Sequence, residues 1–276
     1  MTSRRRRLDI LLVEQGYFPS RERARQAILA GQVLVNGQRA AKPGRMVGPE
    51  DRVEVLRGTE EPPYVSRGGE KLAHALRFFG IDLKDLVVID VGASTGGFTD
   101  CALRAGARKV FAVDVGYGQL DWRLRQDPRV VVLERTNIRY LLPETLGELA
   151  DFATIDVSFI SLTKVLPAVG RLLKPEGRGL ALIKPQFEAG PEKVGKKGVV
   201  RDPAVHVEVC HKVLDFLREQ GWEVRGLTFS PLRGGEGNIE FFVYFSLVPG
   251  CPWPGTVEEV VAEAHTYFAE KGRKPE

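Results

Sequence analysis

The chain has 276 residues, of which 43% are hydrophobic and 28% are charged, a composition typical of a globular protein with one large domain or one large and one small domain. No apolar run approaches the roughly 20 residues of a membrane-spanning helix, and Asp9 and Glu14 interrupt the apolar stretch after the basic start, so we expect neither a membrane span nor a signal peptide. The cysteines are odd in number and lack ligand spacing, which predicts a reducing, cytoplasmic location and no metal site: Cys101, Cys210 and Cys251.

The positive charge is unevenly distributed along the chain. The net charge is +4, and residues 1–67 contain 13 Lys and Arg against 8 Asp and Glu, whereas the remainder contains 27 against 28. All of the excess positive charge therefore belongs to the N-terminal quarter. This placement predicts a polyanionic partner for that segment, with a solvated basic surface as the alternative on charge alone.

The first predicted elements are two short helices and a small sheet. Leucines at helical spacing predict a helix from Leu8 that Gly16 ends, and Ser20 caps a second helix with an apolar stripe. The stretch QVLVNGQRA then predicts two strands joined by a tight Asn36-Gly37 turn, and a last strand follows in DRVEVL. Two helices and a small sheet, with arginines on the second helix, suit a unit that binds a phosphate backbone.

This segment resembles a known RNA-binding domain. The stretch SRERARQAILAGQVLVNGQ is similar to the core of the S-four (alpha-L) domain of ribosomal proteins and RNA-modifying enzymes, and the resemblance spans residues 8–56. We therefore expect an RNA-binding domain at residues 1–58 and a linker rich in Pro and Gly at residues 59–68. On the second helix we expect RNA contacts from three arginines: Arg21, Arg23 and Arg25.

From residue 69 onward, strand-like and helix-like segments alternate. Apolar runs predict strands at 87–91, 109–113, 130–133, 152–156, 179–183, 224–229 and 239–247. Helices are predicted at 69–79, 97–105, 162–173 and 203–220. The alternation predicts an α/β fold: a Rossmann-like, mostly parallel sheet of about seven strands, covered on both faces, whose last two strands form an antiparallel edge pair.

A glycine-rich turn, GASTGG, follows the first of these strands at residues 92–97. A phosphate-binding loop needs Lys and then Ser or Thr after the last glycine, where Phe98-Thr99 stands, and a dinucleotide fingerprint needs glycine where Ser94 stands. Asp114, about 20 residues further on, suits the hydroxyls of a ribose, and Asn137 follows the third strand where an adenine edge is read. A nucleoside without pyrophosphate fits, and S-adenosylmethionine is the common one; a tight turn with no ligand is the alternative.

Charged residues at strand and helix ends separate the possible methyl acceptors. Asp156 ends the fourth strand without the Pro-Pro and aromatic sequence of base-nitrogen methyltransferases, and no cysteine lies where a cytosine-C5 enzyme needs its nucleophile. For a ribose hydroxyl, Lys184 at the end of the fifth strand either takes the proton or orients the oxygen, and the sequence leaves both open. Lys71 and Glu240 are expected to reach the same cleft, although each charge taken singly is as readily a surface residue.

Six stretches together resemble the TlyA (haemolysin A) family of ribosomal-RNA methyltransferases: VSRGGEKL, DVGASTGGFTD, VDVGYGQLDWRLRQDPRVVVLERTN, DVSFISL, IKPQFE and GNIEFF. That family joins an S-four domain to an FtsJ-like catalytic domain, which the resemblance places at residues 69–276. It implies S-adenosylmethionine as cofactor, ribosomal RNA or ribosomal subunits as partner, and 2′-O-methylation of cytidine ribose as activity. The tetrad that it implies is Lys71, Asp156, Lys184 and Glu240. The expected donor site comprises Gly92, Ser94, Thr95, Gly96, Gly97, Phe98 and Asp114, together with Asn137.

Several alternatives stay open at this point. The Gly-Lys loop that contains Lys196 and Lys197 either contacts the RNA backbone or is a mobile solvated loop. A non-catalytic RNA-binding factor of ribosome assembly is the alternative function, and the four intact tetrad positions argue against it. Membrane lysis, which the older family name implies, would need a spanning segment or a long basic amphipathic helix, and the sequence shows neither.

Overall fold

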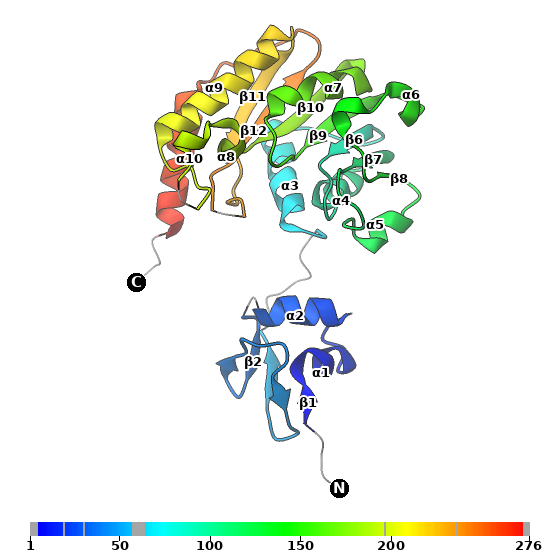
Figure 1. Ribbon diagram of the computed structural model, residues 1–276, viewed down its shortest axis with the longest axis vertical. Coiled ribbons are helices and arrows are strands. Elements are labelled where there is room, and N and C mark those ends of the chain that lie inside the picture. The colour runs from blue at the N-terminus through cyan, green and yellow to red at the C-terminus, as the bar shows by residue number, and fades with distance from the viewer. Residues whose placement is uncertain are drawn as a thin grey trace. The chain divides into compact units, whose positions relative to one another are not determined.

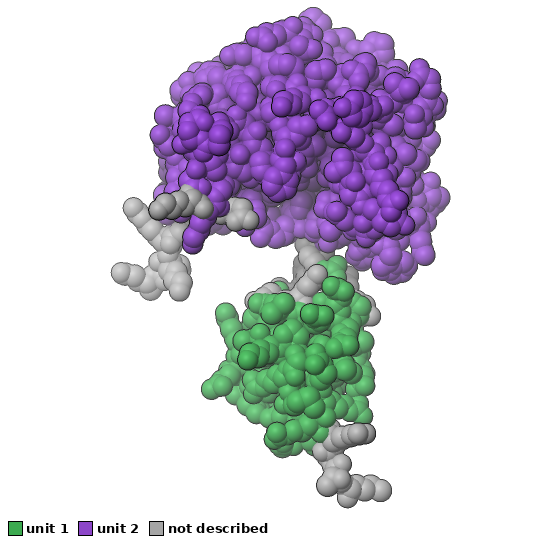
Figure 2. Space-filling view, in the orientation of Figure 1, with its two compact units in different colours: residues 1–62 green, residues 63–276 purple. Residues whose placement is uncertain are grey.

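The computed structural model (Figure 1) describes residues 5–18, 20–29, 31–56, 64–195, 197–235 and 237–272. The chain divides into two units, Met1–Pro62 and Pro63–Glu276, coloured separately in Figure 2. Each unit has its own hydrophobic core. We call them the N-terminal unit and the large unit. Of the segment predicted as a linker, residues 59–63 lie outside the described residues.

Both predicted helices of the N-terminal unit form, as α1 (Leu8–Glu14) and α2 (Arg21–Leu29). They share a core with a three-stranded sheet of order β3-β2-β5, at Gln38–Arg39, Val33–Val35 and Val53–Val55. Asn36 and Gly37 have positive φ angles of 57° and 76°, as the predicted tight hairpin requires. A second, two-stranded pairing joins β1 (Arg6–Arg7) to β4 (Met46–Val47), and strands this short leave no periodic signal in a sequence.

The large unit is built on a seven-stranded sheet with the order β11-β12-β10-β9-β6-β7-β8. Five neighbouring strands run parallel: β10 (Leu173–Ile183), β9 (Ala150–Ile155), β6 (Val87–Val91), β7 (Lys109–Val113) and β8 (Val130–Leu133). The predicted α/β sheet is confirmed, and the limits of β6, β7 and β8 agree with the prediction.

The last two strands form the expected antiparallel pair, but only one of them lies at the edge. β12 (Phe241–Ser246) lies between β10 and β11 (Glu223–Phe229) and runs antiparallel to both. Its first residue, Phe241, pairs with the last residue of β10, Ile183. The start of β12 therefore lies beside the carboxyl end of β10.

Helices cover both faces of this sheet, as predicted (Figure 1). The first core cluster joins one face to α7 (Leu166–Leu172), α9 (Pro203–Glu219) and α10 (Val257–Gly272). The second joins the other face to α3 (Arg67–Phe79), α4 (Gly97–Arg104) and α5 (Trp122–Gln126). Residues alternate along β6, with Ile89 in the first cluster and Val88 in the second. No helix in the described ranges is long and apolar enough to cross a membrane.

Short helical turns complete the large unit: α6 (Pro143–Leu146), α8 (Pro185–Glu188) and the 3-10 turns η1 (Ile138–Tyr140), η2 (Leu162–Lys164) and η3 (Pro191–Lys193). The continuous helix predicted at 162–173 is wrong, because the segment divides into η2 and α7. Pro167 lies in the first turn of α7, where a helix tolerates the proline ring. In a helix interior the same ring would clash with the preceding turn, so one helix could not run through this position without strain. α3 begins at Arg67, two residues before the predicted helix start.

Candidate active site

The glycine turn joins β6 to α4 and touches the chain that follows β9. Gly92 has a φ angle of +85°, and a Cβ atom built on it would collide with the backbone oxygen of Asp156. The backbone N–H groups of Gly92 and Ala93 both donate to the carbonyl of Val113, at 2.9 and 3.1 Å. Only glycine fits this position, so the turn holds the ends of β6, β7 and β9 close together.

Cavity A, of about 480 Å³, opens where these three strands end. Its walls include four of the predicted donor residues, Gly92, Ser94, Asp114 and Asn137. The sequence did not single out its other lining residues, most of which are apolar and lie in loops: Val91, Val113, Val115, Gln119, Thr136, Ile138, Val157, Ser158, Phe159, Ile160 and Val165, with Asp156 beside them. An apolar cavity with a few polar groups is typical of a small-ligand site.

Asp114 and Asn137 organise the loops around cavity A. Asp114 accepts hydrogen bonds from the backbone N–H of Ser94 at 2.8 Å and of Gly116 at 2.7 Å, so it ties the glycine turn to the loop after β7. Asn137 caps η1, because its Oδ1 accepts from the backbone N–H of Arg139 at 3.1 Å. Each carboxylate oxygen of Asp114 has a second lone pair, and the side-chain amide of Asn137 also carries two N–H donors, so both residues have groups that suit a ligand.

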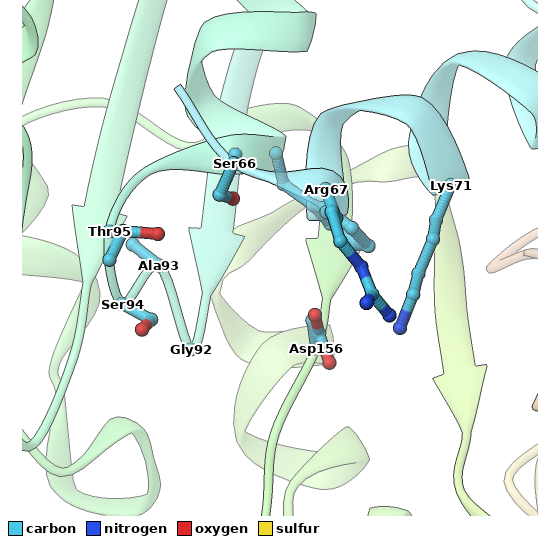
Figure 3. Close-up of a pocket in the computed structure, with 11 residues that line it drawn as sticks. Ser66, Arg67, Lys71, Gly92, Ala93, Ser94, Thr95 and Asp156 are labelled. Atoms are coloured by element: carbon cyan, nitrogen blue, oxygen red, sulfur yellow. The ribbon is translucent and has the colours of Figure 1, made fainter. Parts of the chain in front are cut away.

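Cavity B, of about 150 Å³, adjoins cavity A and is shown in Figure 3. It shares Gly92, Ser94 and Asp156 with cavity A. The predicted donor residues Thr95, Gly97 and Phe98 line it, together with Lys71 and three residues that the sequence reading missed: Ser66, Arg67 and Gly68. In Figure 3 the side chains of Arg67 and Lys71 extend from α3 on the same side and point toward each other.

Gly96 is the one predicted donor residue that is not a lining residue of cavity A or B, as far as the described chain defines them. Its φ angle is +97°, and a Cβ atom there would collide with the side chains of Leu120 and Leu124. The left-handed φ angle of the turn and the close packing of α5 against the turn both require glycine at this position.

The four predicted tetrad residues form two ion pairs beside cavity B. Lys71 Nζ lies 2.6 Å from Glu240 Oε2, and Lys184 Nζ lies 2.6 Å from Asp156 Oδ1. Lys184 Nζ also donates to Ser158 Oγ at 2.9 Å. Although Asp156 Oδ1 is close to Lys184, the angles are not those of a hydrogen bond, and among the described residues this oxygen has no donor.

The two pairs form one electrostatic group. Burial raises the pKa of Glu240 above its ordinary value, while the positive charges of Lys71 and Lys184 oppose the rise and the charge of Asp156 adds to it. The Glu240 side chain is 2% exposed and that of Lys71 is 10% exposed. Two nearly dry, opposite charges in contact are costly to build, which makes this pair a candidate for a functional role.

A second buried carboxyl lies under the glycine turn. Asp90, in β6, accepts hydrogen bonds from the hydroxyls of Thr99 at 2.7 Å and Thr154 at 3.0 Å. Burial raises the pKa of Asp90 to about 7, although both threonine hydroxyls oppose the shift. Asp90 therefore shares in the structure of the turn and reaches neither cavity wall within the described residues.

The predicted RNA-binding residues are placed differently from one another. Arg21 Nε lies 2.8 Å from Oδ2 of the fully buried Asp9, which Arg7 also contacts. Burial alone would raise the pKa of Asp9, but the hydrogen bonds from Arg7 and Arg21 outweigh it and hold that pKa below its ordinary value. Arg21 thus stabilises the N-terminal unit. The remaining predicted residues are the half-buried Arg23, the exposed Arg25 and Lys197, and Lys196, which is outside the described residues.

Phe159 has a conformation that its sequence position does not reveal. Its side chain is 91% exposed, its φ angle is +62°, and its ring lies 4.9 Å from that of Phe187. A bulky residue in the left-handed region is strained, and an exposed aromatic ring gains little from its place. Phe159 lines cavity A and follows Asp156 by three residues, so it belongs to the site.

Comparison with known proteins is consistent with this geometry. The model of the FtsJ-like methyltransferase family matches residues 64–247, and that of the S4 domain matches residues 6–53. The chain is 50% identical over 284 residues to the candidate rRNA methyltransferase YqxC of Bacillus subtilis, which covers 98% of each chain. It is 45% identical over 242 residues to the 16S/23S rRNA (cytidine-2′-O)-methyltransferase TlyA of Mycobacterium tuberculosis, covering 88% of this chain and 90% of that one.

A solved structure extends the likeness to the fold. A candidate hemolysin from Streptococcus thermophilus superposes with a TM-score of 0.77 and 45% identity, over 98% of this chain and 99% of that chain. The family match covers the sheet, the glycine turn and all four tetrad positions. This chain therefore belongs to the FtsJ-like methyltransferase family, in the group of relatives named TlyA and hemolysin, and carries an S4 domain ahead of its catalytic unit.

Proposed function

We propose that this protein methylates the 2′-hydroxyl of a cytidine ribose in ribosomal RNA, with S-adenosylmethionine as methyl donor, and that it works in the cytoplasm. Membership of the FtsJ-like family supports methyl transfer, and the TlyA relative carries this reaction in its name. The observation that carries the proposal is the meeting of two lysine–carboxylate pairs where cavities A and B join.

Cavity A fits the methyl donor. The apolar side chains of Val113, Ile138 and Val165 suit an adenine ring, and Asp114 offers carboxylate oxygens to ribose hydroxyls. The glycine turn lets the rest of the ligand approach the backbone closely. When bound, S-adenosylmethionine supplies a methyl group on a positively charged sulfur. Asp156 lines both cavities, and we expect this methyl group and the ribose oxygen to meet beside it.

The tetrad would orient the ribose hydroxyl and take its proton. Lys184 Nζ lies 2.6 Å from Asp156 Oδ1 and donates to Ser158 Oγ, which fixes its position, so we assign this lysine to holding the 2′-oxygen in line. Asp156 Oδ1 receives the proton that the hydroxyl loses as the oxygen gains the methyl group, because this carboxylate oxygen has acceptor capacity to spare. Lys71, held by Glu240, adds a second positive charge beside the developing negative charge on the oxygen.

The N-terminal unit would dock on structured RNA. We assign residues 1–58 to RNA binding, residues 59–68 to the linker and residues 69–276 to methyl transfer, which the S4 match and the basic N-terminal quarter support. Arg23 and Arg25 on α2, and Lys197 in the large unit, are the proposed contacts to the RNA backbone. Arg21 would contribute only its exposed part, since Asp9 engages it.

The test is a methylation assay on ribosomal subunits that lack the modification. Purified protein and S-adenosylmethionine are added, and the RNA is mapped by mass spectrometry, with a new 2′-O-methylcytidine as the expected product. Lys184→Ala should bind the donor with unchanged affinity and lose turnover. A non-catalytic assembly factor would bind the subunits and leave their RNA unmodified, which would refute the proposal.

The role of Lys184 is tested by a second variant. Arginine keeps the positive charge but does not release its proton near neutral pH, so Lys184→Arg should retain part of the activity if residue 184 orients the oxygen. The measurement is the single-turnover rate of methylation at saturating donor. If Lys184→Arg is as inactive as Lys184→Ala while donor binding is intact, Lys184 itself takes the proton.

A further inference from the structure

A third cavity meets cavity B at Arg67. Cavity C, of about 520 Å³, is lined by Arg67 and Glu70 of α3 and by the loop residues Leu232, Arg233, Gly234, Gly235 and Gly237. Arg67 lines both cavity B and cavity C, so the two spaces meet at its side chain. Cavities A, B and C therefore follow one another, with Asp156 between the first two and Arg67 between the last two.

The loop that lines cavity C is held in place by its own contacts. Arg233 Nη1 donates to the carbonyl of Gly237 at 2.9 Å, and its guanidinium lies 4.4 Å from the centre of the Phe268 ring. The Asn238 side chain, which is fully buried, accepts from the backbone N–H of Val200 and donates to the carbonyl of Gly198, both at 2.8 Å. Contacts with α10 and with residues 198–200 therefore hold the loop that lines the cavity in place.

The same loop passes directly over the catalytic pair. A Cβ atom on Gly234 would collide with the Glu240 carboxylate, so glycine is required there for the loop to lie this close. Gly235 differs, because a Cβ atom there would meet no described atom within 4 Å and its φ angle is not in the left-handed region. Neither packing nor backbone conformation explains glycine at 235. A ligand approaching the backbone at this point would explain it.

Arg67 is the charged residue that lines both cavity B and cavity C in the described part of the chain. Its guanidinium has five N–H donors and makes one hydrogen bond to the described residues, from Nη2 to the carbonyl of Arg233 at 2.8 Å. Arg67 is exposed, and the ion pairs formed among the described residues do not include it. A planar guanidinium with unused donors, fixed at one corner, is well suited to bind a phosphate.

We propose that cavity C receives the nucleotide that follows the target cytidine, and that Arg67 binds the phosphodiester between the two. This rests on the proposed 2′-O-methylation. In RNA the 2′- and 3′-oxygens lie on neighbouring carbons of one ribose, so the 3′-phosphodiester is the anion nearest to the reacting oxygen. Arg67 and Lys71 are one turn apart on the same face of α3, and Figure 3 shows their side chains pointing toward each other. Both residues line cavity B together with Asp156.

The direction of the strand follows from this arrangement. Lys71, Asp156 and Arg67 line the same cavity, so an oxygen that Lys184 holds beside Asp156 places the adjoining 3′-phosphate within reach of Arg67, and the chain then continues into cavity C. Glu70, in the wall of the same cavity, accepts hydrogen bonds and suits a sugar hydroxyl or a base N–H of the following nucleotide. The base of the target cytidine is left on the side of Phe159, because the methyl donor occupies cavity A.

The first experiment measures kcat/KM for unmodified ribosomal subunits as a function of salt. Arg67→Ala should lower kcat/KM about tenfold near 0.1 M salt, the order expected for one lost phosphate contact, and should reduce the slope of log kcat/KM against log salt by about one. Arg67→Lys keeps the charge and should recover part of the loss. Arg77→Ala, an exposed arginine at the other end of α3, is the matched control and should change neither quantity.

The second experiment identifies the nucleotide in cavity C. Cys101 and Cys210 are buried, so Glu70→Cys in a Cys251→Ser background gives one reactive thiol, to which a short photoreactive group is attached. After irradiation with ribosomal subunits, primer extension should stop at the nucleotide on the 3′ side of the methylated cytidine. Arg77→Cys in the same background is the control.

The outcomes separate this inference from the function on which it rests. If the wild-type protein produces no 2′-O-methylcytidine, the proposed function fails and the inference fails with it. If the wild type is active but Arg67→Ala behaves like Arg77→Ala, or the crosslink maps to the 5′ side, the function stands and the assignment of cavity C is overturned. Unchanged donor affinity and unfolding temperature in Arg67→Ala are the controls for folding.

Discussion

The buried pair of Lys71 and Glu240 makes a quantitative prediction about stability. The Glu240 side chain is 2% exposed and the Lys71 side chain 10% exposed, so removing either partner leaves a charge without its counter-ion in a dry place. Loss of one partner from such a pair costs roughly 3–5 kcal/mol of unfolding free energy. We expect about 3 kcal/mol for Lys71→Met or Glu240→Met, at the lower end of this range, since Lys184 remains as an opposite charge near Glu240 in the first variant.

The double variant tests whether the charges of Lys71 and Glu240 act as an ion pair or independently of each other. Lys71→Met with Glu240→Met replaces both charges by linear apolar side chains of similar size, and its stability should lie within about 1 kcal/mol of the wild type. Methyl transfer should be lost in all three variants. The pair would then be a device for catalysis that contributes little net stability.

The pH dependence of Lys71→Met provides a check of sign. Burial raises the pKa of Glu240, and Lys71 is the largest influence that opposes the rise, so its removal raises that pKa further. A carboxyl whose pKa is higher in the folded than in the unfolded state binds protons preferentially on folding. Lys71→Met should therefore regain stability as the pH falls through the raised pKa, while the double variant should not.

Urea unfolding followed by tryptophan fluorescence measures the unfolding free energy of the large unit, because Trp122, Trp222 and Trp253 all belong to it. In thermal unfolding, a unit of this size loses roughly 3 °C of melting temperature per kcal/mol, so each single variant should melt about 10 °C below the wild type. Single variants that lose less than about 1 kcal/mol, or a double variant that loses the sum of both, would refute the picture of a desolvated ion pair.

Three further predictions concern the glycine turn. Asp90→Asn keeps both threonine partners, and since the pKa of Asp90 is raised to about 7, folding takes up a proton between about pH 4 and pH 7 and wild-type stability falls as the pH rises through that window. Urea titrations at several pH values should show a flatter profile for the variant, and an unchanged slope would contradict the assignment. Gly92→Ala should destabilise the large unit by roughly 2–4 kcal/mol in the same unfolding assay, through the left-handed φ angle and the collision with Asp156. Gly118→Ala, with a φ angle of +72° and open space around the Cβ atom, should lose only the conformational part. Asp114→Asn turns one acceptor into a donor that faces a backbone N–H, and calorimetry should show S-adenosylmethionine binding at least about tenfold weaker; equal affinity would remove Asp114 from the site.

Local sequence patterns were sufficient to predict several strands and the first hairpin of the fold. The strands at 87–91 and 109–113 were predicted to the residue because an apolar run ends at a glycine or an aspartate on the sheet edge. The hairpin at Asn36-Gly37 was predicted because both residues tolerate a positive φ angle. The break at 164–166 was missed because the apolar period continues through it, and only Pro167 signals the new start.

Parts of the site depend on contacts between distant segments. The glycine turn and the tetrad positions were predicted, but Arg67 and Ser66 were missed because the predicted helix began at 69 and left them in a linker. The exposure and left-handed backbone of Phe159 have no counterpart in a pattern of residue types. The partner that engages Arg21 lies twelve residues earlier, on another helix, and no periodicity of α2 reveals it.

The position of β12 decides whether a tetrad can form at all. Asp156 and Lys184 directly follow parallel strands, so they emerge at the same edge of the sheet, where Ile155 pairs with Ala181. Glu240 directly precedes its strand, and it reaches this edge only because β12 runs antiparallel, with Phe241 opposite Ile183.

A parallel β12 would carry Glu240 to the other edge, roughly 20 Å away at about 3.3 Å per residue. Lys71 would then be buried without a partner, and the loop of cavity C, which enters β12 from residue 238, would leave the site together with Glu240. One reversed strand, inserted between β10 and the edge strand β11, therefore brings both the fourth tetrad residue and the proposed site for the next nucleotide to the place where methyl transfer is expected.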